Sequence, residues 1–231
     1  MRTVAALPAV VLALAMPAIA RADAVQDQVV AAAKAVSPTG YGFTQTTRVE
    51  RPGAAAKLFV SRYDPAKAVA QRWTLVSVDG KPPTAKAAAE AAKAARAQDV
   101  PSYAEVAKWF GAAATRIAQT PTSATYRFAR LPAGTVKIGK HDASADTMAE
   151  ATVDLAGGVP VVTRVRYVST AGFRMALVVK VDRYVFVTTY RAGPAAQPVI
   201  DSVTAEMTGS LLGKAGTLTT RTHFTDVRAV R

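Results

Sequence analysis

The chain's two histidines are the side chains best suited to catalysis or metal binding. His141 is followed by Asp142, Asp146 and Glu150, and one imidazole with three carboxylates is a set that a divalent cation accepts. No two of these residues fall at a recognised ligand spacing, and a solvated polar loop accounts for them equally well. His223 lies within the last predicted strand and is expected to be an exposed strand residue. We therefore expect no metal and no cofactor.

Sequence motifs of the common catalytic folds are missing from the chain. There is no Gly-x-Ser-x-Gly elbow of a serine hydrolase, no phosphate-binding P-loop and no dinucleotide-binding glycine motif. The chain has no cysteine, so it has no thiol nucleophile, no thiolate metal ligand and no disulfide. Carboxylates that pair in space for glycoside hydrolysis show no local pattern here. We therefore expect a protein that is not an enzyme.

The first 24 residues have the order of a cleaved secretory signal peptide. Arg2 supplies a positive charge, residues 5–16 are apolar without a break, and small residues follow. The apolar run is shorter than the roughly 20 residues that span a bilayer. Cleavage is predicted after Ala24, with Ala20 as a nearly equal alternative. Without a cysteine to carry a lipid anchor, the mature chain is predicted to be free in the bacterial periplasm.

Length and charge limit the domain count and the partners. A chain of 231 residues, half of them hydrophobic, fits one domain over 25–231 that builds a core without staples. The net charge of +13 would usually suggest nucleic acid, but predicted export argues against it. Anionic lipid, a membrane surface or an acidic envelope protein is the better expectation. A merely solvated basic surface is an equal alternative, and we expect a monomer.

Hydrophobic periodicity predicts one helix and then three strands. An apolar stripe at helical spacing covers 25–36, and the Ser37-Pro38-Thr39-Gly40 stretch ends it. Alternating segments separated by turn residues then predict strands at 41–50, 57–63 and 71–78.

The middle of the chain predicts a helical insert over about 84–110. Thr84 caps an alanine-rich helix that runs to about Gln98, and the alanine face can bury little area per turn. Ser102 and Glu105 form a capping box for a second helix, which Gly111 ends. The apolar stripe of this second helix consists of Val106, Trp109 and Phe110.

Strands return after the insert, and a loop over 131–147 reads as irregular. The predicted strands are 112–119, 123–130, 148–155, 159–168, 173–190, 198–209 and 216–227. The long run 173–190 is one bent strand or two strands that meet near Asp182 and Arg183. There the apolar set slips by one position, as it does at a β-bulge.

These elements predict an α+β protein that is mainly antiparallel β. About ten strands are too many for a flat open sheet, so the sheet must curl or close. We expect a strongly curved sheet or unclosed half-barrel, with the helical insert packed on its concave face.

The order of elements resembles the periplasmic lipoprotein carriers of the LolA/LolB-like superfamily, and Phe43-Thr44-Gln45-Thr46 is similar to a strand that follows their first helix. The resemblance, to an uncharacterised branch, implies an unclosed barrel with a helical lid over an apolar cavity. It also implies binding of lipid or acylated cargo. The chain departs from the family in its alanine-rich first insert helix, and no arginine here matches the one that locks the carriers' lid.

Function is therefore predicted to lie in a cavity. The first hypothesis is a non-catalytic periplasmic binding or carrier protein for a lipid or acylated ligand. The alternative is an envelope protein–protein interaction or sensor domain that uses the same half-barrel. The predicted cavity residues, the last two of them on the lid, are Phe43, Leu58, Val60, Trp73, Leu75, Tyr126, Phe128, Tyr167, Phe173, Met175, Leu177, Phe186, Trp109 and Phe110.

Overall fold

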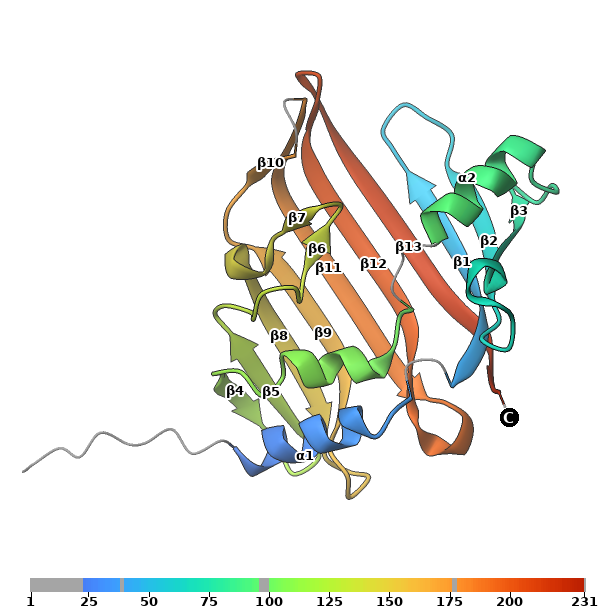
Figure 1. Ribbon diagram of the computed structural model, residues 1–231. Helices are drawn as coiled ribbons and strands as arrows, with labels where there is room; N and C mark the ends of the chain where they lie inside the picture. The colour runs from blue at the N-terminus through green and yellow to red at the C-terminus, as the bar shows by residue number, and fades with distance from the viewer. Residues whose placement is uncertain (1–22, 38–39, 96–99, 176–177, 231) are drawn as a thin grey trace, which may run out of the picture.

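The structure is a computed structural model that describes residues 23–37, 40–95, 100–175 and 178–230 (Figure 1). Its helices are α1 (Ala24–Lys34) and α2 (Ala85–Ala95), and its 3₁₀ turns are η1 (Val69–Gln71), η2 (Tyr103–Lys108), η3 (Ser144–Asp146) and η4 (Pro194–Ala196). Its strands are β1 (Tyr41–Glu50), β2 (Lys57–Tyr63), β3 (Trp73–Val78), β4 (Thr115–Gln119), β5 (Ser123–Phe128), β6 (Lys137–Ile138), β7 (His141–Asp142), β8 (Thr147–Asp154), β9 (Val161–Ser169), β10 (Phe173–Met175), β11 (Val179–Ala192), β12 (Pro198–Leu211) and β13 (Lys214–Ala229).

One antiparallel sheet of eleven strands forms the body of the protein. Its order is β3-β2-β1-β13-β12-β11-β9-β8-β5-β4, with β10 beside β11, while β6 and β7 form a separate hairpin. The order has two ends, β3 and β4, so the sheet is an unclosed half-barrel, and the helices lie on its concave face (Figure 1). This confirms the predicted fold class. No helix in the described ranges is long and apolar enough to cross a bilayer.

Strand register identifies the side chains on the concave face, because successive residues of a strand point to opposite faces. Thr47 of β1 lies opposite Phe59 of β2 and Thr222 of β13, and Thr222 lies opposite Val203 of β12. All four share the concave face. Residues one position away along each strand, such as Arg48 beside Thr47, lie on the convex face.

Half of the sheet carries a dense apolar cover. We call β4, β5, β8, β9 and β11, with α1 and η2 on them, the packed half. Val29 of α1 and Val106 and Phe110 of the η2 segment are fully buried there. The side-chain amide of Gln26 on α1 donates to the carbonyls of Phe110 at 2.8 Å and Ala112 at 3.1 Å. These two bonds join α1 to η2, so the two act as one cover.

The start of α1 is anchored by Asp23. Its carboxylate caps the helix by accepting the Val25 N–H at 3.0 Å, and it also accepts the Tyr126 hydroxyl at 2.7 Å. Arg116 on β4 lies 3.4 Å from the same carboxylate. One side chain thus links α1 to β4 and β5. Residues 1–22 of the predicted leader lie outside the residues that the structure describes.

The opposite half of the sheet is more lightly covered. We call β1, β2 and β3, with α2 above them, the open half (Figure 1). No residue of α2 is buried. The buried side chains of this half belong to an aromatic cluster shared with the neighbouring strand β13. In it Phe43 lies 5.2 Å from Tyr63, 5.5 Å from Trp73 and 5.4 Å from Phe224 of β13, ring centre to ring centre.

Local structure differs from the sequence prediction at three places. The second insert helix is the short 3₁₀ turn η2, in which the Ser102 hydroxyl accepts the Ala104 N–H at 3.2 Å. The predicted irregular loop over 131–147 contains the β6–β7 hairpin and η3. The run 173–190 is two strands, β10 and β11, which separate before Val179 and not near Asp182.

A bulge does occur where the apolar pattern slips. The register of β11 against β12 shifts between Val181 and Arg183. Gly209 lies opposite this point, and a Cβ there would come within 2.0 Å of the Lys180 carbonyl oxygen. Only glycine fits so close an approach of two backbones, so this residue permits the bend of the long central strands.

Candidate ligand groove on the concave face

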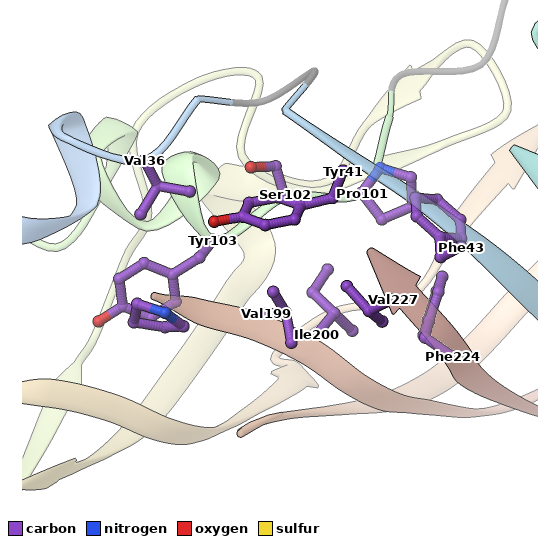
Figure 2. A pocket seen from close by; sticks show the side chains of 11 residues that line it. Val36, Tyr41, Phe43, Pro101, Ser102, Tyr103, Val199, Ile200, Phe224 and Val227 are labelled. Carbon is purple, nitrogen blue, oxygen red and sulfur yellow. The ribbon is translucent and has the colours of Figure 1, made fainter. Parts of the chain in front are cut away.

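The packed half and the open half meet over β12 and β13, and we call this region the seam. Figure 2 shows a pocket there whose volume is about 30 Å³, room for about one water molecule. Its side chains come from the segment after α1, from β1, from the start of η2 and from β12 and β13: Val36, Tyr41, Phe43, Pro101, Ser102, Tyr103, Pro198, Val199, Ile200, Phe224 and Val227. Among the described residues, the seam therefore offers no site for a larger ligand.

A larger groove lies between α2 and the open half of the sheet, with a volume of about 470 Å³. We call it the α2 groove. Its roof is the alanine face of α2 with Glu90, and alanine methyl groups are too short to fill the space beneath the helix. Its floor is formed by Gln45, Thr47, Phe59, Ser61, Trp73, Thr74 and Leu75.

A second groove of about 260 Å³ lies beside η2, and we call it the η2 groove. Its apolar walls are formed by Trp109, Tyr167, Phe186, Tyr190, Ile200 and Val203. Charged residues also line it: Glu105 and Lys108 form an ion pair at 2.7 Å, and Lys137 lies in the same lining. With Lys108 paired to Glu105, Lys137 leaves this groove a net positive charge, and an apolar wall beside a positive charge suits a ligand with an apolar body and an anionic end.

The two grooves lie on either side of β13 on the same face. Between them the floor carries a chain of polar side chains: Gln45 donates its amide to the Thr47 hydroxyl at 3.1 Å, and the hydroxyls of Thr47 and Thr222 are 3.0 Å apart. The amide oxygen of Gln45 is buried and has no hydrogen-bond partner in the described part of the chain. A ligand that donates a hydrogen bond would satisfy that oxygen.

Burial raises the pKa of the phenols that line the η2 groove. Desolvation raises the pKa of Tyr167 well above its usual value, and the charge of Glu105 adds to the rise. Desolvation likewise raises the pKa of Tyr190, with smaller contributions from Tyr167, Tyr103 and Glu105. Tyrosine is uncharged at neutral pH with or without this shift, so these walls present neutral aromatic surface to a ligand.

The structure distributes the predicted cavity residues over several places. Trp73 and Leu75 line the α2 groove, while Trp109, Tyr167 and Phe186 line the η2 groove. Phe43 lies at the seam. Leu177 falls outside the described residues. The remaining predicted residues on the concave side belong to the core of the packed half or pack against it: Phe110, Tyr126, Phe128, Phe173 and Met175.

Two predicted cavity residues, Leu58 and Val60, lie outside the cavity. The sequence prediction placed both in the cavity, but the register of β2 against β1 puts them on the convex face, where Leu58 is 36% exposed. Phe59 and Ser61 line the groove instead. The inward face of β2 becomes evident only once Tyr63 is known to be buried, because Ser61 and Phe59 lie on the same face as that residue.

Several further groove residues were missed by sequence reasoning, among them Gln45, Thr47, Ile200 and Val203. Gln45 entered the sequence analysis only within the motif that resembles the carriers, and Thr47, Ile200 and Val203 only as members of predicted strands. An irregularity in β12, where Tyr190 pairs with Ile200 but Thr189 pairs with Ser202, brings Ile200 and Val203 to the same face. No pattern in the sequence marks that irregularity.

Stacking and hydrogen bonds hold the loop that carries His141 and Asp142. The ring of His141 stacks on Phe173 at 4.0 Å. Asp142 accepts hydrogen bonds from the Gly134 N–H at 2.8 Å and the Ser144 hydroxyl at 2.6 Å, and the bond from Ser144 is the main cause that lowers the pKa of Asp142. Within the described ranges, no group of three or more histidine, cysteine or carboxylate side chains could hold a metal ion. His223 is exposed on the convex face.

The chain has a likeness to known proteins in structure but not in sequence. No protein-family model matches the chain, and no curated protein matches it either. Among solved structures, the crystal structure of a LolA superfamily protein from Nitrosomonas europaea is similar, with a TM-score of 0.40 and 10% sequence identity. The match covers 90% of this chain and 94% of that one.

Proposed function

We propose that the protein is a non-catalytic binding or carrier protein for an apolar or acylated ligand, held in the α2 groove. The observation that carries this proposal is a helix without a single buried residue above a groove of about 470 Å³ with an aromatic wall. Ligand pockets are concave, largely apolar and commonly about 300–1,000 Å³ in volume. The α2 groove fits each of these criteria.

The energetics of α2 support the same proposal. Burial of apolar side chains supplies most of the stability of a surface helix, and α2 buries none. Its contacts are to β3 and η1. An apolar chain lying between Leu75 and Ala91 would remove both from water and would hold the helix down. Ligand binding is therefore expected to order and stabilise α2.

The polar floor restricts the ligand further. Gln45 offers a buried acceptor, while the aromatic and aliphatic wall accommodates an acyl chain. A ligand with an apolar chain and a hydroxyl or amide group satisfies both. The proposed place of action is the bacterial periplasm, which the signal-like first 24 residues and the absence of cysteine support.

The first test is native mass spectrometry of protein purified gently from its own source, together with uptake of an apolar fluorescent dye by delipidated protein. We expect an extra mass that disappears on organic extraction, and dye uptake that added fatty acid reverses. A protein with neither bound lipid nor dye uptake would contradict the proposal. The groove would then be better explained as the contact site for an envelope protein partner.

A pair of matched variants locates the site. Ala91→Trp places an indole in the roof of the groove, so dye affinity should fall by about tenfold or more. Ala89→Trp introduces the same side chain on the exposed side of α2 and should leave dye affinity unchanged. Equal affinities for the two variants would place the dye elsewhere.

A further inference from the structure

The hairpin between β12 and β13 exposes two large aliphatic side chains at one end of the sheet (top of Figure 1). Leu211 is 58% exposed and Leu212 is 73% exposed. The Leu212 N–H donates to the Val178 carbonyl at 2.8 Å, and Val178 is itself exposed. We call Val178, Leu211 and Leu212 the apolar tip. Bulky aliphatic side chains gathered at a protruding turn have no role in the core.

The backbone of the tip is also strained. The two-residue turn has φ values of +51° at Leu212 and +79° at Gly213. Two-residue hairpin turns of this kind favour Asn-Gly or Gly-Gly, because the first position needs a residue that tolerates positive φ. A leucine there is an outlier with an energetic cost. Asparagine would adopt this backbone conformation at a lower energetic cost. The stability of the fold therefore does not explain the leucine.

Basic side chains surround the apolar tip. Lys214 directly follows the turn and is exposed. Arg174 on β10 lies opposite Lys180 on β11, and two like charges in such a pair repel each other. Lys180 also forms an ion pair with Asp182 at 2.6 Å. With one acid against three bases, this end of β10–β13 carries excess positive charge.

A neighbouring loop adds to the same charge. Glu50 at the end of β1 lies opposite Thr219 near the start of β13, so the β1–β2 loop is at the same end of the sheet as the apolar tip (Figure 1). Arg51 in this loop and Lys57 at the start of β2 are exposed, while Glu50 pairs with two arginines.

We propose that this end of the sheet docks on an anionic lipid surface, with Leu211 and Leu212 inserted at the headgroup boundary. Aliphatic side chains that insert into the interface, ringed by lysine and arginine that contact lipid phosphates, are the combination by which peripheral proteins bind such surfaces. The tip is a narrow turn with three apolar side chains, which is little area for a protein interface. This proposal is independent of the ligand in the α2 groove.

Vesicle co-sedimentation tests the proposal on the whole protein. We expect binding to vesicles of phosphatidylcholine with phosphatidylglycerol, weakening as salt is raised, and much less binding to phosphatidylcholine alone. Leu212→Asn should weaken binding by about tenfold, since it removes a side chain whose burial is favourable. It should also keep or raise the midpoint of chemical denaturation, because Asn-Gly suits the turn. Lost binding in a fully folded protein is thus the expected signature.

The matched control is Val69→Asn. Val69 is 74% exposed on η1, at the opposite end of the sheet, and its substitution should leave vesicle binding unchanged. Equal loss in the two variants, unchanged binding in Leu212→Asn, or equal binding to both vesicle types would overturn the proposal. Self-association at the tip would overturn it too, and would appear as a dimer in wild-type protein that Leu212→Asn abolishes. The groove variant Ala91→Trp should bind vesicles normally, so failure of one proposal is distinguishable from failure of the other.

Discussion

The packed half and the open half share one sheet and differ in the helices that cover them. Over the packed half, α1 and η2 carry valine and aromatic side chains that are fully buried, among them Val29, Val106 and Phe110. Over the open half, α2 has an alanine face with no buried residue. The size of the side chains that a helix turns toward the sheet therefore decides whether the space beneath it is core or groove.

The difference has a thermodynamic meaning. Burial of a large apolar side chain contributes roughly 1.5–3 kcal/mol, so the cover of the packed half contributes to global stability. The cover of the open half contributes little, because α2 has no buried residue. The following predictions test this difference with matched substitutions.

The largest effect is expected from Phe110→Ala in the packed half. Phe110 is fully buried, so its truncation should lower the free energy of unfolding by about 3–5 kcal/mol. The matched variant Phe59→Ala removes the same side chain from the half-buried wall of the α2 groove and should cost about 1 kcal/mol. Denaturant titration followed by circular dichroism measures both. Similar losses would remove the distinction between the halves.

The packed half should also unfold at alkaline pH. Desolvation raises the pKa of Tyr103 and of Tyr126 to about 12, whereas unfolded tyrosine ionises near pH 10. Between pH 10 and 12 the unfolded chain loses protons that the folded chain keeps, so stability falls as pH rises. Denaturation midpoints at pH 9, 10 and 11 should decrease, and Tyr103→Phe should flatten that decrease. A flat profile in wild-type protein would contradict the prediction.

A smaller effect is expected from Asp23→Ala. The substitution removes the helix cap of α1 and the partner of Tyr126, with an expected loss of about 1–2 kcal/mol in the free energy of unfolding. Asp27→Ala removes an exposed carboxylate from the same first turn and should cost less than about 1 kcal/mol. A larger loss for Asp27→Ala would show that charge at the helix start, and not the Asp23 contacts, anchors α1.

The two predicted leader cleavage sites differ in their effect on this anchor. Cleavage after Ala24, the predicted site, would remove Asp23 and with it the cap of α1, whereas cleavage after Ala20 would keep it. A chain that starts at Val25 should therefore be less stable than one that starts at Arg21, by about the loss expected for Asp23→Ala. Denaturant titration of the two chains measures this difference, and equal stability would contradict it.

The smallest expected effect is a difference in amide exchange between the two helices, and it needs no substitution. Amide exchange should be faster in α2 than in α1, because a helix without buried side chains opens locally at low cost. A bound apolar ligand should slow exchange in α2 and leave α1 unchanged. Equal protection of both helices in the free protein would mean that α2 is a fixed part of the fold.

Much of the fold could be predicted from the sequence because its strands alternate and turn residues separate them. The predicted bounds of 41–50 and 57–63 agree with β1 and β2, and the slip of the apolar set near Asp182 marks a bulge. The division of 173–190 was placed wrongly, since both strands are apolar on either side of the turn and no glycine or proline marks it.

The groove was less predictable than the fold. Leu58, Phe59 and Val60 are all apolar, so alternation alone does not say which of them faces inward. Trp109 and Phe110 were expected on a lid, yet Phe110 is core and only Trp109 also lines a groove. Periodicity identifies an apolar face, but the volume between two faces depends on how closely the elements approach.

The pairing of β1 with β13 also affects the order in which the chain folds. The two strands are separated by most of the sequence, whereas β1, β2 and β3 follow one another closely. Contacts so distant in sequence form slowly. Until Phe224 arrives on the last strand, the ring of Phe43 lacks one of its aromatic neighbours and one edge of β1 is unpaired. During synthesis the open half is therefore exposed to aggregation longest, and any chain that stops short of β13 keeps that exposure.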